Sequence, residues 1–167
     1  KNDSLHRRTT GKINTISVII DDQLWNGEIG DSIRNKFASP VVGLPQEEPL
    51  FSINQYPVKL LEGFMTDSRA IIVVKKDEEN KFEIRENQYA SPQYVFHISG
   101  KTGTDIIGCL EKNAPKMIQL IKEMEIAESQ RINSLSLRNQ KVIENKFHIS
   151  LEIPSTYDYV LHKSNLL

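Results

Sequence analysis

Two identical four-residue segments could bring two imidazole side chains together. Phe96-His97-Ile98-Ser99 recurs as Phe147-His148-Ile149-Ser150, and both alternate apolar and polar residues, as half-buried strands do. If the two strands lie side by side, His97 and His148 share the face opposite the apolar side chains, where they could bind a metal ion or transfer a proton. No Asp, Glu or Cys accompanies them at ligand spacing. We therefore favour the simpler interpretation that a polar sheet face needs polar side chains.

Three other residues are candidate binding residues. Glu47 and Glu48 lie within residues 43–51, where prolines and a glycine predict an ordered, extended loop. Neighbouring carboxylates could bind a cation, but adjacent side chains seldom point the same way, and the prolines are better explained as fixing an ordered crossing. Trp25 could contribute to a binding surface, although it begins an apolar stripe and is better explained as part of the core.

The sequence lacks the motifs of the familiar enzyme classes. It contains no G-x-S-x-G elbow, no G-x-x-x-x-G-K phosphate loop, no H-E-x-x-H and no C-x-x-C. The single cysteine, Cys109, stands beside an apolar helical face, which favours an inert buried thiol over a nucleophile. We therefore predict no catalytic residue, no metal and no cofactor, and an enzyme is the less favoured alternative.

Composition and charge argue against a nucleic-acid-binding surface. The 167 residues include 21 Lys and Arg and 22 Asp and Glu, which give a formal net charge of -1, and the basic residues are scattered. No apolar run approaches the ~18 residues of a membrane-spanning helix. Residues 1–12 are polar and lack periodicity, so we predict a polar tether over 1–12 and a single domain over 13–167.

One long helical stretch, residues 102–137, dominates the second half of the chain. It begins with a capping box at Thr102 and contains Pro115, which predicts a kink or break near Asn113. An earlier helix is predicted between Asp22 and Pro40, and its glycines at positions 27 and 30 indicate close packing or a backbone contact.

The remaining apolar patterns predict a β-sheet. Residues 69–76 give the strongest signal for a central strand, and residues 82–86 would form an edge strand in a hairpin with it. Further strands are predicted at residues 13–20, 50–54, 94–99 and 147–153. The expected fold class is α+β: a mixed β-sheet with helices packed on one face, and a long kinked helical crossover before the last strand.

Several of these segments resemble a known family. The resemblance covers residues 11–159 and is carried by Trp25-Asn26-Gly27-Glu28-Ile29-Gly30-Asp31, Gly43-Leu44-Pro45-Gln46-Glu47-Glu48-Pro49-Leu50-Phe51, Phe64-Met65, Arg69, the helical residues Glu125, Glu128 and Arg131, and Phe147-His148-Ile149-Ser150-Leu151-Glu152-Ile153-Pro154. In these residues the chain is similar to the domain of unknown function 4837 family of Bacteroidetes envelope lipoproteins.

The resemblance implies a place in the cell envelope, on the periplasmic side or at the outer membrane. Residues 1–12 would then be the spacer behind a lipid-anchored cysteine, and the chain would be the N-terminal half of a longer protein. The family supplies no catalytic residue. We hypothesise a non-enzymatic module that binds or scaffolds an envelope protein or a cell-wall component. The alternative is a metal-dependent or hydrolytic envelope enzyme that uses His97 and His148.

Overall fold

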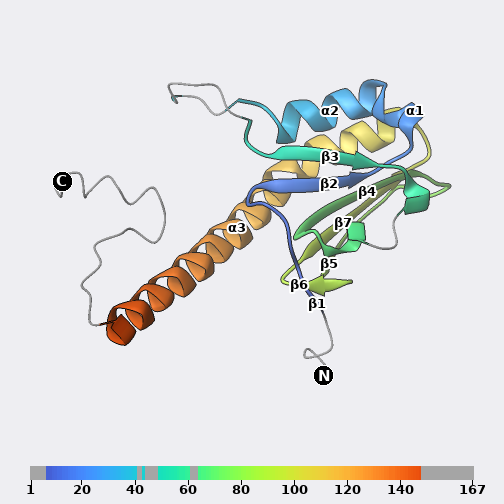
Figure 1. The fold of residues 1–167 in the computed structure, drawn as a ribbon. Coiled ribbons are helices and arrows are strands. Elements are labelled where there is room, and N and C mark those ends of the chain that lie inside the picture. Colours follow the sequence, from blue (N-terminus) through green and yellow to red (C-terminus); the bar gives the residue numbers. More distant parts are fainter. Residues whose placement is uncertain (1–6, 41–42, 44–48, 61–63, 148–167) are drawn as a thin grey trace. The chain divides into compact units, whose positions relative to one another are not determined.

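The computed structural model describes residues 7–40, 43, 49–60 and 64–147 (Figure 1). Its strands are β1 (Arg7–Arg8), β2 (Thr15–Ile19), β3 (Ser52–Tyr56), β4 (Ala70–Lys76), β5 (Lys81–Glu86), β6 (Ala90–Ser91) and β7 (Tyr94–Gly100). Its α-helices are α1 (Asp22–Trp25), α2 (Glu28–Phe37) and α3 (Gly103–Phe147), and two 3-10 turns, η2 (Val58–Leu60) and η3 (Phe64–Asp67), precede β4.

Five strands form one mixed sheet in the order β3-β2-β4-β7-β5. The first four are parallel, and β5 runs antiparallel to β7. The short strands β1 and β6 pair separately from this sheet. The predicted α+β fold class is confirmed. β4, a continuous apolar run over its first five residues, is central, as a strand buried on both faces must be.

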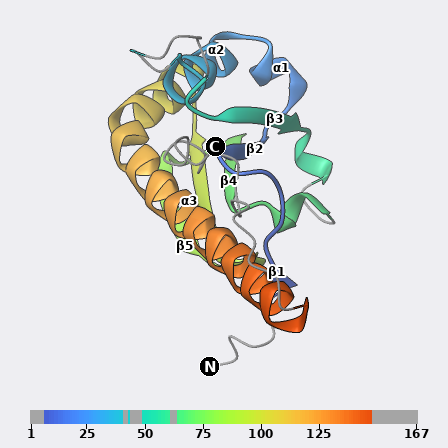
Figure 2. The same cartoon turned by 60° about the vertical axis from the view of Figure 1, so that its left-hand side comes forward.

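One face of the sheet is covered by α1, α2 and the first part of α3 (Figure 2). Strand residues point alternately to the two faces, and helix residues at three- and four-residue spacing meet those that point toward the helices. Each fully buried aliphatic or aromatic side chain in this core contributes about 2 kcal/mol. The core consists mainly of Ile16, Val18, Ile72, Val74, Phe96 and Ile98 from the sheet and Ile29, Ile33, Phe37, Ile106, Leu110, Met117 and Ile121 from the helices.

The segment after β2 forms two helices where the sequence predicts one. α1 ends at Trp25, and α2 begins at Glu28 with Gly27 in the N-cap position. The chain turns so tightly between them that a Cβ atom on Gly30 would lie 1.7 Å from the carbonyl oxygen of Trp25. The predicted close packing is therefore confirmed at Gly30. The prediction of a single helix is wrong, because the chain turns at residues 26–27 between α1 and α2.

The predicted hairpin between residues 69–76 and 82–86 is also wrong, because β7 lies between β4 and β5. β4 is buried on both faces and needs a neighbour on each side, which β2 and β7 provide. β5 alternates Phe82 and Ile84 with charged residues, and such a strand is suited to an exposed edge. The prediction that residues 82–86 form an edge strand is thus confirmed, although its pairing partner is different.

α3 begins as predicted and continues through Pro115 as one helix, so of the predicted kink or break the break is absent. The capping box is present: Asp105 N donates to Thr102 Oγ1 at 3.1 Å, and Thr102 N donates to Asp105 Oδ2 at 3.3 Å. A proline inside a helix removes one backbone hydrogen bond. Ala114 and Met117, on either side of it, are buried in the core, and this packing holds the helix together where the bond is lost.

The chain divides into two compact units, Lys1–Met124 and Glu125–Leu167. The first contains every strand of the sheet, α1, α2 and the start of α3. In the second, Glu125 and Glu128 are buried, and Arg131 forms an ion pair with Glu128 at 2.7 Å. None of the helices in the described residues combines the length and the apolar character needed to cross a membrane.

Several predictions fall outside the described residues. Glu47, Glu48 and His148 belong to this group, as does most of the loop at residues 43–51. The predicted last strand, residues 147–153, also lies outside them except for Phe147, with which α3 ends. These sites and this strand stay predictions.

Candidate functional site

The face of the sheet opposite the helices, here called the distal face, has a small apolar centre surrounded by polar side chains. Ile19, Ile71, Val73 and Val95 are buried there and form a second apolar cluster. The polar residues next to this cluster come from the same alternating strand positions. The distal face therefore has both a rigid base and groups that can form hydrogen bonds.

A polar pocket of about 420 Å³ lies on the distal face, near the start of β2, β3 and β4. Thr15 pairs with Ser52, and Ile16 pairs with Ala70, so the three parallel strands begin at similar levels. Residues at or just before these strand starts can therefore line one site. The lining consists of Thr10, Gly11, Lys12, Thr15, Ser17, Ser52, Asn54, Tyr56, Ser68 and Arg69.

Arg69 holds one wall of this pocket in place. Its Nη2 donates to the carbonyl oxygens of Gly11 at 2.8 Å and Lys12 at 2.9 Å. The residue is only 4% exposed, so these charge-assisted bonds are shielded from water. The position of the backbone at residues 11–12, and with it the shape of the pocket, depends on this guanidinium.

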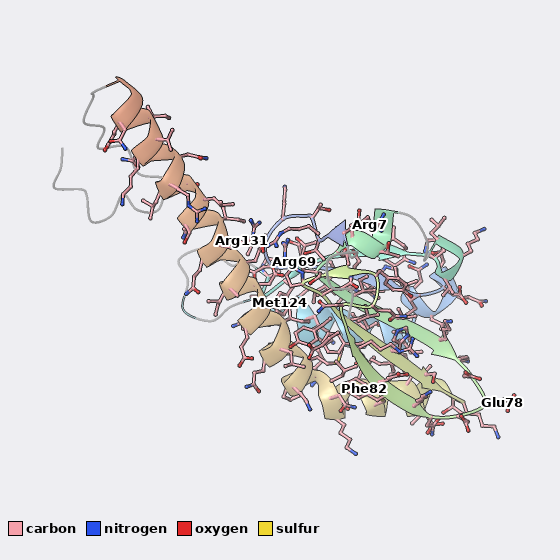
Figure 3. The ribbon with its side chains drawn as sticks, turned by 90° about the horizontal axis from the view of Figure 1, so that it is seen from below. Arg7, Arg69, Glu78, Phe82, Met124 and Arg131 are labelled. Atoms are coloured by element: carbon pink, nitrogen blue, oxygen red, sulfur yellow. The ribbon has the colours of Figure 1, made fainter. Side chains whose placement is uncertain are left out.

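The preceding residues are joined to the domain as well. Arg7 forms an ion pair with Asp67 at 2.7 Å, and the backbone N–H of Thr10 donates to the carbonyl oxygen of Asp67 at 2.9 Å. Arg7 and Arg69 are both labelled in Figure 3. Residues 7–12, the second half of the segment expected as a polar tether, therefore make specific contacts with the domain.

The wall around Ser68 is fixed by Gln93, which is 2% exposed. Its Nε2 donates to the carbonyl oxygens of Thr66 at 2.7 Å and Ser68 at 2.8 Å, and its Oε1 accepts backbone N–H groups of residues 89–90. The hydroxyl of Ser68 is thereby placed 2.6 Å from the hydroxyl of Ser17. A buried amide with all these partners makes this part of the pocket rigid.

The charges of the pocket favour a ligand that is rich in hydrogen-bond acceptors. Two of the lining residues are cations and none is an acid. The guanidinium of Arg69 already donates to the backbone, whereas Lys12 is exposed and its ammonium group pairs with no carboxylate among the described residues. Lys12 can therefore bind an incoming anion, while the hydroxyls of Thr15 and Ser52 can either donate or accept.

His97 lies on the distal face, as predicted, but outside the polar pocket. It lines a smaller hollow of about 150 Å³ with Glu83 and Arg85, and its Nε2 is 2.8 Å from Gln88 Oε1. Burial, helped by the charge of Arg85, lowers the pKa of His97. The hydrogen bond from Arg85 lowers the pKa of Glu83.

Among the residues that the structure describes, no cluster of three His, Cys, Asp or Glu side chains could hold a metal ion. The pairing with His148 stays a prediction.

The lowered pKa of His97 predicts a pH-dependent stability. The folded pKa lies below the unfolded value of about 6.5, so the unfolded chain takes up this proton first as the pH falls. The stability that the neutral imidazole contributes is fully present above the unfolded pKa, and it is lost as the pH falls through the folded pKa. Urea unfolding between pH about 7.5 and about 5.5 should show a smaller loss for His97→Gln than for the unchanged protein. Equal losses would contradict this assignment.

The surroundings of Trp25 and Cys109 favour a role in packing for both side chains. Trp25 packs against the main core, and the guanidinium of Arg34 lies 4.4 Å from its ring centroid, so its own chain already occupies one face of the ring. Burial raises the pKa of the Cys109 thiol, and Asn113 Nδ2 lies 3.6 Å from its sulfur. The raised pKa agrees with the predicted inert thiol.

None of the residues that line the polar pocket is among the binding residues predicted from the sequence. The available signal was weak: Thr15 and Ser17 alternate with buried residues of β2, and Ser52 and Asn54 stand on either side of the partly buried Ile53 in β3. Alternation of this kind indicates a polar face, but it does not show which polar faces adjoin.

Comparison with known proteins gives one family. A family model described as Domain of unknown function (DUF8532) matches residues 9–134, which include every residue that lines the polar pocket. Neither a curated protein nor a solved structure matches the chain.

Proposed function

The chain belongs to the DUF8532 family, a domain of unknown function, and we propose that its first unit is a non-catalytic binding module. The ligand would present a negatively charged, acceptor-rich group to the polar pocket on the distal face. The predicted resemblance to the domain of unknown function 4837 family is a separate hypothesis that this family match does not test.

One observation carries the proposal: the pocket combines hydroxyls, an amide and two cations with no acidic residue. The two closest hydroxyls, Ser17 and Ser68, hydrogen-bond to each other. Neither contacts an imidazole or a carboxylate among the described residues, and such a contact is what would activate a serine as a nucleophile. The geometry thus supports holding a ligand better than transforming one.

Titration with small anions tests the proposal. Inorganic phosphate and succinate, added separately, should shift the backbone NMR signals of Gly11, Thr15 and Ser52. Lys12→Gln should weaken the binding about three- to fivefold, because one partly solvated charge pair is lost. Lys101→Gln, which removes an exposed charge outside the pocket lining, is the matched control and should leave the affinity unchanged. Signals that move with neither anion would contradict the proposal.

We propose further, from the resemblance to envelope lipoproteins, that the module works at a membrane surface on a lipid anchor. Its partner would be an envelope protein or a cell-wall component. The native protein should then appear in the membrane fraction, and its intact mass should exceed that of its polypeptide by the mass of acyl chains. A soluble native protein without acyl chains would contradict this localisation and leave the pocket proposal unaffected.

A further inference from the structure

One edge of the five-stranded sheet is available for pairing. β3 is the end strand, and among the described residues no strand pairs with it on the side away from β2. The two residues just before β3 do form backbone hydrogen bonds: Leu50 N donates to Ser39 O at 2.8 Å, and Phe51 N donates to Phe37 O at 3.0 Å. Beyond Phe51, no other strand of the described part of the chain is paired with this edge.

The pairing pattern identifies the backbone groups on this edge. Ser52 N donates to Asn14 O, and Tyr56 O accepts from Ile20 N, so alternate residues of β3 use their backbone groups toward β2. The N–H and C=O groups of Ile53 and Gln55 therefore point outward. No hydrogen bond from these backbone groups to another described residue is found.

The two edges of the sheet differ in their protection against pairing. β5, at the other end, carries Lys81, Glu83, Arg85 and Glu86, and charges of this kind discourage the addition of another strand. β3 has the sequence Ser-Ile-Asn-Gln-Tyr, without a charge or a proline. β3 therefore lacks the charges and prolines that keep other strands from adding to an edge.

The outer edge of the sheet and part of the pocket lining both belong to β3. Ser52, Asn54 and Tyr56 line the pocket from β3. A strand added to β3 would lie about 4.8 Å away, with every second side chain on the distal face. Such side chains would stand beside a pocket that contains Lys12 and Arg69 and no acid.

We propose that β3 accepts an extended acidic peptide as a sixth strand. The backbone of the peptide pairs with Ile53 and Gln55, and alternate carboxylate side chains enter the pocket toward Lys12. This inference rests on the proposed binding function and names its ligand class. The backbone pairing supplies affinity, and the pocket selects acidic side chains.

The test uses the intact chain and a synthetic peptide, acetyl-Thr-Val-Glu-Val-Glu-Val-Thr-amide. Binding should shift the NMR signals of Ile53 and Gln55 and slow their amide hydrogen exchange. Replacing both Glu by Gln in the peptide should weaken binding at least about threefold, because the charge attraction to Lys12 is lost.

Two N-methylated isomers of the peptide provide the decisive control. One is methylated at the third and fifth residues, the other at the fourth and sixth, so only one blocks the peptide edge that faces β3. That isomer should bind at least about tenfold more weakly than the parent peptide, because two hydrogen bonds are lost, and the other should bind like the parent.

Equal binding of the two isomers, or unchanged exchange at Ile53 and Gln55, would overturn the strand-addition proposal. If phosphate or succinate still shifts the signals of the pocket residues, the binding function stands while the peptide inference fails. If no anion or peptide shifts those signals, both proposals fail.

Discussion

Replacing Gly30 by alanine is expected to lower the free energy of unfolding by about 3 kcal/mol. The new Cβ would lie 1.7 Å from the carbonyl oxygen of Trp25, far inside contact distance, and the atom it meets is backbone, not the end of a flexible side chain. The turn between α1 and α2 would have to open, and Ile29 and Ile33, both buried in the core, would move with α2. Thermal unfolding should show a decrease in Tm of about 6 to 12 °C.

Gly108→Ala is the matched control for this prediction. Gly108 lies in α3, is exposed, and has nothing within 4 Å of the position of an added Cβ. Alanine there should stabilise the protein by about 1 kcal/mol, because it favours the helix and reduces the freedom of the unfolded chain. If both variants change stability in the same direction and by similar amounts, the close approach at Gly30 does not determine the packing of α2.

Arg69→Met is expected to cost about 2 to 3 kcal/mol of stability and to disrupt the polar pocket. Methionine keeps much of the buried side-chain volume but removes both charge-assisted bonds to the carbonyl oxygens of Gly11 and Lys12. Residues 11–12 then lose the contact that fixes their backbone. Binding of succinate should weaken at least about tenfold, because the pocket loses the charge of Arg69 as well as the fixed position of Lys12.

The matched control is Arg85→Met, at an exposed arginine of β5 whose partner is Glu83. This change should affect stability much less and leave succinate binding intact, because exposed ion pairs contribute little and Arg85 does not line the polar pocket. Chemical unfolding and anion titration of both variants check the prediction. Unchanged anion affinity in a folded Arg69→Met protein would show that residues 11–12 do not need this arginine.

Features that depend on local pattern could be predicted closely. The apolar run of β4 indicated a central strand, and its two neighbours confirm it. Alternation in β7 placed Phe96 and Ile98 toward the helices and His97 on the other face, as the structure has them. The capping box at Thr102 is equally local, since its groups lie within one turn of helix.

Two outcomes depended on interactions that no single segment contains. The hairpin prediction for β5 failed because the order of strands depends on which neighbour buries β4 best. Of the kink or break predicted near Asn113, the break did not form because core packing of the flanking residues outweighs one missing backbone bond. In both cases a tertiary contact overrode a sound local preference.

The sequence by itself determined which apolar side chains share the buried face of each element, because the periods of strand and helix depend only on neighbouring residues. Only the tertiary structure decided where a ligand could bind. The polar pocket is assembled from residues 10–12, β2, β3 and the two residues before β4, which are far apart in the chain and have no common motif. Their meeting depends on strand order and register, and these are set by the packing of the whole sheet against its helices.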